Sequence, residues 1–204
     1  EGVEILSQSR IFDLREFSPN ARDEDSRGYV TAWDRIVVRF NEEYEGDRQV
    51  VFTGVFPMNV IEIRQPENQP QGIFKRVLHP IDGPEEINDL RHALHEVVFD
   101  LSGVPIGERV TLQAMTMATV PPSMTGHLPF FVNKRTELLT SWLLFPEDMP
   151  YSTYRLVRYP VDKSSPPIPM DPRFAIDHPF GSLIGWSVIT PKEGMVYECR
   201  WTNQ

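Results

Sequence analysis

The chain has 204 residues, 40% of them hydrophobic and 24% charged, so it is long enough to form a core without disulfides or a structural metal. Its formal net charge of -9 repels phosphate backbones and anionic lipids, and its basic residues are scattered. No apolar run approaches the ~18 residues that a membrane-spanning helix needs. We therefore predict a globular protein that binds neither nucleic acid nor membranes.

Short runs of β-branched and aromatic residues, separated by 19 prolines and 12 glycines, predict strands throughout the chain. Near the C-terminus Tyr197, Cys199 and Trp201 alternate with Glu198 and Arg200, which predicts one packed face and one wet face. The predicted strands run from Glu4 to Leu14, Tyr29 to Phe40, Gln49 to Phe56, Asn59 to Arg64, Phe74 to Leu78, Leu94 to Leu101, Arg109 to Thr119, Glu137 to Phe145, Thr153 to Tyr159, Leu183 to Ile189 and Val196 to Trp201.

Strands without intervening helical crossovers favour antiparallel pairing. The predicted fold is therefore mainly β, an antiparallel two-sheet β-sandwich of about ten strands. One short helix near 84–92 is predicted from Gly83-Pro84-Glu85-Glu86 and the apolar spacing that follows. We predict a single enlarged sandwich over 1–204, because no repeat relates the halves. The alternative is two small sandwiches, 1–120 and 126–204.

Two stretches predict long loops. Residues Ser18 to Gly28 are polar and charged, and Pro160 to Pro179 holds six prolines. A proline-rich connection of that length typically crosses between sheets or covers a sheet edge. The acidic sequence from Asp23 to Gly28 permits a calcium-loop interpretation, but Arg27 stands where an oxygen ligand belongs, so a solvated loop is favoured.

An acid, a base and a hydroxyl lie close together at Asp177, His178 and Ser182. A hydrolase needs the imidazole between the other two groups and donors aimed at the oxyanion, which neighbours on one loop rarely provide. A proline/glycine turn entering the Leu183 strand is the favoured interpretation. These three residues remain candidates for the alternative function of a hydrolase.

A second cluster consists of His79, His92 and His95, which are candidate metal ligands. The pattern is not His-Glu-x-x-His, and no cysteine lies nearby to complete a zinc site. We predict histidines on a sheet surface or at a helix end, and neither a metal nor another cofactor. Cys199 alternates in phase with buried aromatic residues and is predicted to lie in the core.

The tryptophans Trp33, Trp142 and Trp186 fall in predicted strands. Aromatic side chains in strands usually pack between sheets, and we predict core positions for them. A surface row of tryptophans could instead stack on sugar rings. A carbohydrate-binding module is therefore the other alternative function.

The segment from Gly194 to Trp201, after Thr190-Pro191-Lys192-Glu193, resembles the turn and strand late in immunoglobulin-like and fibronectin type III-like domains. The segment from Asp100 to Glu108, leading into Val110-Thr111-Leu112, is similar in the same way. The chain departs from that pattern at Met195, and the paired cysteines of antibody domains are missing. The resemblance implies a β-sandwich that presents loops or sheet faces to a partner.

These observations predict a non-catalytic binding or scaffold module with a protein partner, contacted through loops such as Ser18 to Gly28 or Pro160 to Pro179. A single cysteine favours an intracellular, cytoplasmic protein. A homo-oligomer is compatible with exposed sheet edges. The absence of an initiator methionine is compatible with a segment of a larger multidomain protein.

Overall fold

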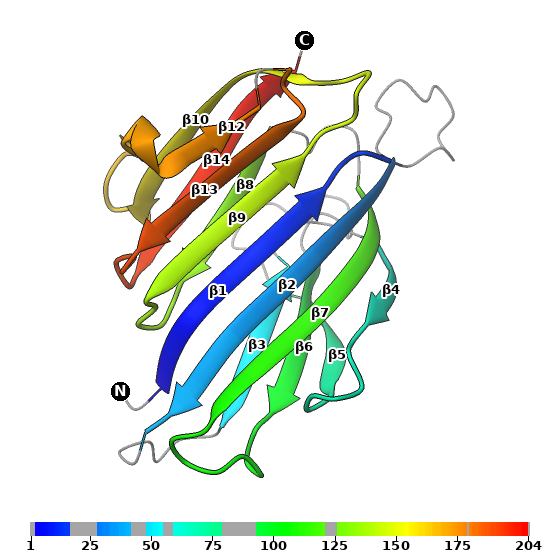
Figure 1. Ribbon diagram of the computed structural model, residues 1–204, viewed down its shortest axis with the longest axis vertical. Coiled ribbons are helices and arrows are strands. Elements are labelled where there is room, and N and C mark those ends of the chain that lie inside the picture. The colour runs from blue at the N-terminus through cyan, green and yellow to red at the C-terminus, as the bar shows by residue number, and fades with distance from the viewer. Residues whose placement is uncertain are drawn as a thin grey trace.

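The computed structural model describes residues 3–16, 28–41, 48–54, 59–78, 93–120, 126–178 and 180–203. Within these ranges the chain is mainly β-structure, as the sequence predicts (Figure 1). The predicted strands are all present, with bounds shifted by a few residues at most. The predicted helix near 84–92 lies outside the described residues. The one helix within them is a short 3-10 turn, Pro172–Phe174.

The largest sheet has seven strands and draws on both halves of the chain. Its central pair, β1 and β9, is parallel, with Gln8 opposite Leu139, and its other pairs are antiparallel. In spatial order the strands are β12 (Ala175–Asp177), β13 (Leu183–Ile189), β9 (Leu138–Leu144), β1 (Val3–Asp13), β2 (Gly28–Phe40), β7 (Arg109–Val120) and β4 (Asn59–Arg64).

Two smaller antiparallel sheets lie behind the seven-stranded sheet in Figure 1, one behind its upper part and one behind its lower part. The first has four strands in the order β11 (Ile168–Pro169), β10 (Tyr151–Pro160), β14 (Met195–Asn203) and β8 (His127–Val132). The second has three strands in the order β3 (Gln49–Gly54), β6 (Ala93–Asp100) and β5 (Gly72–Leu78). Strand β8 ends one small sheet and β3 ends the other.

The prediction of two antiparallel sheets is therefore wrong. The described residues form three sheets, and the pair of strands β1 and β9 is parallel. Alternation along a strand determines which residues share a face, but it does not determine which strand lies alongside. A parallel pair needs a long connection rather than a helix as such. The chain from β2 to β8 supplies that connection between β1 and β9.

The buried apolar residues form two clusters with no member in common. The larger lies under the four-stranded sheet and includes Phe145, whose ring packs against Tyr151 and Trp201. The smaller lies under the three-stranded sheet and includes Phe99. Two separate cores favour two domains, whereas one large sheet built from both halves of the chain favours a single domain. The prediction of a single domain therefore stays a prediction.

Cys199 is fully buried in the larger cluster, which confirms its predicted core position. Burial, with a smaller contribution from the Glu198 charge, raises the pKa of its thiol to about 12. The thiolate, which is the reactive form, is therefore scarce at neutral pH.

The proline-rich segment does both things predicted of it. Ile168 and Pro169 form the edge strand β11 beside β10, and Ala175–Asp177 forms the edge strand β12 beside β13. The segment thus crosses from the four-stranded sheet to the seven-stranded sheet and covers an edge of each. None of the helices in the described ranges is long and apolar enough to cross a membrane.

Candidate functional site

The loop at His178 is a hydrogen-bonded turn between β12 and β13. The amide of His178 donates to the Leu183 carbonyl, and the amide of Gly181 donates to the His178 carbonyl. The His178 ring does meet Ser182, with Nδ1 3.1 Å from the serine Oγ, and the amide of Phe180 also donates to Nδ1. The structure therefore brings two of the three candidate catalytic residues together.

The third member does not join them. No hydrogen bond links Asp177 to the imidazole among the described residues, and Asp177 and His178 are both exposed. In a working triad the acid bonds one ring nitrogen and the serine bonds the other. Here Nδ1 takes both the hydroxyl and the Phe180 amide, which is the arrangement of a stabilised turn.

The candidate metal ligands cannot be brought together from the described residues. His79 and His92 lie outside them, and His95 is placed only as a backbone position in β6, opposite Gly54 and Arg76. Across the part of the chain that the structure describes, no group of three or more His, Cys, Asp or Glu residues could hold a metal ion.

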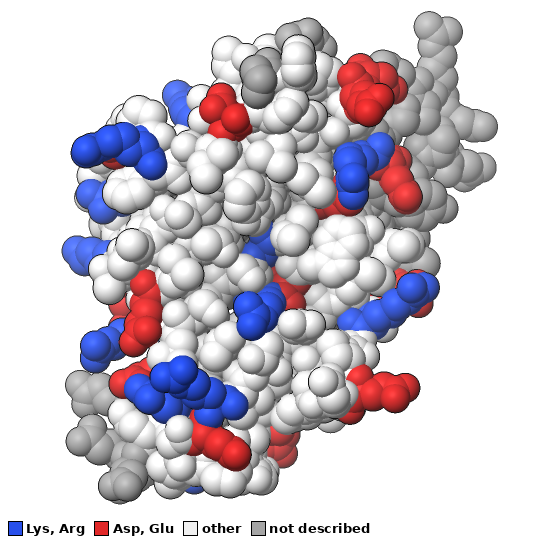
Figure 2. Space-filling view, in the orientation of Figure 1, with Lys and Arg blue, Asp and Glu red and all other residues white. Residues whose placement is uncertain are grey.

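The tryptophans divide between core and surface. Trp186 is buried, but Trp33 is 38% exposed, and Trp142 is half-buried with its ring against Gly185. Trp33 and Trp142 lie on the outer face of the seven-stranded sheet, separated by Ile11 in one cross-strand row. Figure 2 shows this face as mostly uncharged, with a small group of basic and acidic side chains near its centre and most of the other charged side chains toward its rim. The predicted core position is therefore wrong for Trp33, because none of the described strands packs over the outer face of this sheet.

A groove of about 430 Å³ lies between the two small sheets. Its floor is the inner face of β1 and β2, and its walls include residues 49–52 of β3 and 129–131 of β8. Arg10 and Asp34 form an ion pair of 2.6 Å in the floor, and the Arg10 guanidinium lies over the Phe130 ring. The rest of the lining is largely apolar.

Both walls of this groove are edge strands, but their backbones differ. The Leu101 amide donates to the Arg48 carbonyl, so Arg48 is a residue whose backbone hydrogen-bonds to β6. Such residues recur at every second position of an antiparallel strand, and Val51 falls between two of them. The N–H and C=O of Val51 therefore point away from β6. Just before β8 the Gly126 carbonyl accepts from the Trp201 amide, so the residues that hydrogen-bond to β14 follow at every second position from Gly126. Pro129 falls between two of them, and its backbone nitrogen points away from β14. Since proline has no N–H, β8 lacks a donor there. Strand β3 offers the complete edge.

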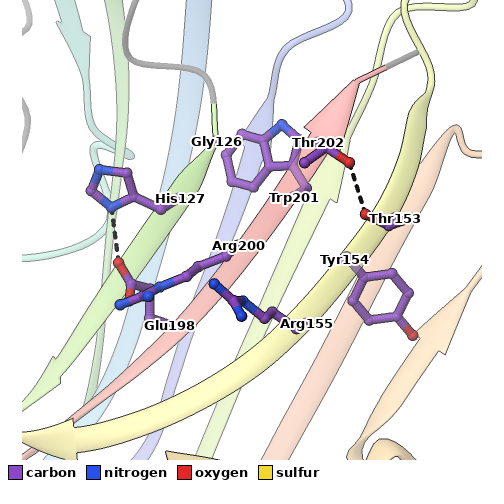
Figure 3. A pocket seen from close by; sticks show the side chains of 9 residues that line it. All are labelled: Gly126, His127, Thr153, Tyr154, Arg155, Glu198, Arg200, Trp201 and Thr202. Carbon is purple, nitrogen blue, oxygen red and sulfur yellow. Dashed lines mark hydrogen bonds and ion pairs between the residues drawn. The ribbon is translucent and has the colours of Figure 1, made fainter. Parts of the chain in front are cut away.

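A second cleft, of about 640 Å³, opens on the outer face of the four-stranded sheet (Figure 3). Three strands supply a row of basic side chains across it: Arg155 of β10 lies opposite Arg200 of β14, which lies opposite His127 of β8. One row further along, the hydroxyls of Thr153 and Thr202 are 2.7 Å apart.

Glu198 holds part of this row in place. Its carboxylate accepts from His127 Nδ1 at 2.9 Å and from Arg200 Nε at 2.7 Å, and the residue is only 4% exposed. Burial acts to raise the pKa of Glu198, but the hydrogen bonds from His127 and Arg200 outweigh it and hold the pKa below its usual value. Glu198 is therefore ionised at neutral pH.

The sequence prediction of a wet face for Glu198 and Arg200 is wrong for Glu198. Alternation correctly places both residues opposite Tyr197 and Cys199, which are buried. It cannot show that His127, 71 positions away, covers the carboxylate. His127 itself lies in β8, a strand that the sequence analysis missed, so no local signal pointed to this cluster.

The Glu198 charge has a testable effect on stability. We expect Glu198→Gln to lower the free energy of unfolding by about 1–2 kcal/mol at pH 7, because the neutral amide loses the ion pair with Arg200 and has one acceptor oxygen where the carboxylate uses two. The folded pKa lies below the ordinary 4.5, so this stabilisation is complete above about pH 4.5 and is lost as the pH falls through the folded value. Urea unfolding of both proteins from pH 7 to about 3 measures it.

Glu193→Gln, at an exposed glutamate in the turn before β14, is the control and should change stability little. A Glu198→Gln deficit that stayed constant across the pH range would contradict the ion-pair account.

No protein-family model matches this chain, and no curated protein sequence matches it. Among solved structures the chain is similar to a putative protease from Parabacteroides distasonis, with 13% identity, a TM-score of 0.47 and coverage of 98% of this chain and 40% of that one. It is similar to yeast LTA4 hydrolase in complex with bestatin, with 6% identity, a TM-score of 0.44 and coverage of 97% and 28%. The chain thus spans less than half the length of either protein.

Proposed function

We propose that this chain is a non-catalytic binding module that takes up an extended segment of a protein partner in the groove between β3 and β8. The observation that supports this best is the outer edge of β3, which no other strand of the described residues covers, beside a largely apolar groove of about 430 Å³. An extended peptide adds to such an edge through main-chain hydrogen bonds, and its alternate side chains enter the neighbouring pocket.

Strand β3 is suited to this role by its sequence. Val50 and Phe52 are buried in the smaller core and anchor the strand, while Val51, between them, is exposed. No proline interrupts the edge, and charged side chains, which commonly protect such edges, are absent from residues 49–54. The groove lining favours a partner segment with apolar residues at alternate positions.

Val51→Pro tests the proposal, because the N–H that it removes points away from β6 and takes no part in the β3–β6 hydrogen bonds. Peptides selected on the protein from a phage-displayed random library serve as probes. We expect Val51→Pro to weaken their binding about 10-fold or more, while Val51→Thr, which keeps the N–H and the branched side chain, stays within about 3-fold.

Thermal unfolding of both variants checks that the fold is retained. Failure to select any peptide, or equal binding of the selected peptides to the proline and threonine variants, would refute the proposal.

The other functional predictions are untested and stay proposals. The resemblance to immunoglobulin-like and fibronectin type III-like domains, a homo-oligomer, the hydrolase at Asp177, His178 and Ser182, and a carbohydrate-binding module at the tryptophans belong here. So does a cytoplasmic location, for which the buried free thiol of Cys199 is the supporting observation. The loop from Ser18 to Gly28, apart from Gly28, lies outside the described residues.

A further inference from the structure

The cleft on the four-stranded sheet concentrates positive charge in a protein whose formal net charge is -9. Arg155 and Arg200 are cross-strand partners, and both side chains line the cleft. Like charges directly opposite on neighbouring strands destabilise a sheet. Glu198 is the one carboxylate lining the cleft, so the two guanidiniums leave one positive charge in excess.

The two arginines differ in their partners. Both oxygens of Glu198 are engaged, one by His127 and the other by Arg200. Arg155 is exposed and makes no hydrogen bond or ion pair within the described part of the chain. In Figure 3 its guanidinium points toward the Arg200 side chain and carries no dashed line. The donors of Arg155 are therefore available to a ligand.

We propose that this cleft binds a phosphate or sulfate group, held by Arg155 and Arg200 with the Thr153 and Thr202 hydroxyls beside it. A guanidinium presents a planar fork of N–H donors that matches the oxygens of such a group. A tetrahedral oxyanion has more oxygens than a carboxylate, and they point in different directions, so it can accept from two guanidinium forks on different sides at once. Bound between the arginines, it offsets their mutual repulsion.

The cleft is larger than a free phosphate ion. Its volume of about 640 Å³ lies in the range of sites for small organic ligands. The cleft therefore has room for a larger molecule that carries the anionic group, either a small phosphate or sulfate ester or a modified side chain of a peptide. This site lies on a different sheet face from the β3 groove and does not depend on the peptide proposal.

Isothermal titration of the 204-residue chain with inorganic phosphate, inorganic sulfate and phosphoserine tests the site. We expect saturable binding with a dissociation constant of about 1 mM or lower. Arg155→Gln should weaken it about 10-fold or more, and Arg155→Lys, which keeps the charge but loses the fork, should weaken it by an intermediate factor.

Arg158→Gln is the matched control, because it removes the same charge from the same strand at an exposed residue that does not line the cleft. We expect it to stay within about 2-fold of the wild type. A phosphoserine peptide bound more tightly than phosphoserine identifies the peptide source, and equal affinity identifies a small ester. Absence of saturable binding by the wild type, or equal losses in Arg155→Gln and Arg158→Gln, would overturn the site.

Discussion

Replacing Phe99 with alanine should lower the free energy of unfolding by about 3–5 kcal/mol, the largest effect that we expect of a single substitution in this chain. Phe99 has no exposed surface and sits in β6, the central strand of the three-stranded sheet. The centroids of the Phe99 and Phe52 rings are 5.0 Å apart, and the rings pack edge to face. Gly72 packs directly against the Phe99 ring. No neighbouring side chain can fill the cavity without leaving its own packed position.

The Phe99→Ala substitution also tests whether the two hydrophobic cores unfold independently of each other. Hydrogen exchange should show protection lost in β3, β5 and β6, while β10 and β14, over the other core, keep most of theirs. Urea unfolding gives the free energy, and Phe99→Leu, which keeps most of the volume, should cost less than about 1.5 kcal/mol. Uniform loss of protection across the chain would show that the cores unfold as one cooperative unit.

Gly181→Ala should lower the free energy of unfolding by about 3 kcal/mol. Gly181 has φ of 69°, where an L-residue costs about 1–2 kcal/mol. An added Cβ would also lie 2.5 Å from the Tyr151 carbonyl oxygen and 2.9 Å from the Pro150 Cβ. Because the Tyr151 amide donates to the Gly181 carbonyl, the two segments cannot separate without losing that bond.

Gly194→Ala separates the two contributions. Gly194 has φ of 76°, but an added Cβ there would meet nothing within 4 Å. We expect it to cost only the backbone strain of about 1–2 kcal/mol. Thermal and urea unfolding of both variants measure the difference, and equal losses would show that the contact with Tyr151 is relieved by a local shift.

The strands could be predicted from the sequence because alternation and proline or glycine boundaries are local signals. Strand β8 was missed because Pro129 stands inside its apolar run, which argues against a strand unless the proline lies at an edge. Here it does, with its missing N–H directed away from β14. Strands β11 and β12 are too short to show alternation and lie among prolines.

The candidate sites were less predictable because each depends on strand neighbours. The β3 groove exists because β3 and β8 end their sheets, a fact of pairing that no run of residues encodes. The anion cleft needs Arg155, Arg200 and His127 in one row, and they come from three strands that are far apart in the sequence. By contrast, the hydroxyl–imidazole contact of Ser182 and His178 is local and was found as a cluster.

The parallel pairing of β1 with β9 affects how the protein is made. When β1 and β2 have left the ribosome, β9, which pairs with the other edge of β1, has not yet been synthesised. Gln8, for example, cannot pair until Leu139 has been made. At about 5–20 residues per second this interval is on the order of ten seconds. Throughout it the nascent chain carries an open edge at the centre of its future largest sheet, where another chain could pair. We therefore expect slower synthesis or a lower temperature during expression to change the yield of folded protein, because both change how long this edge of β1 stays unpaired. The effect does not depend on the stability of the finished fold.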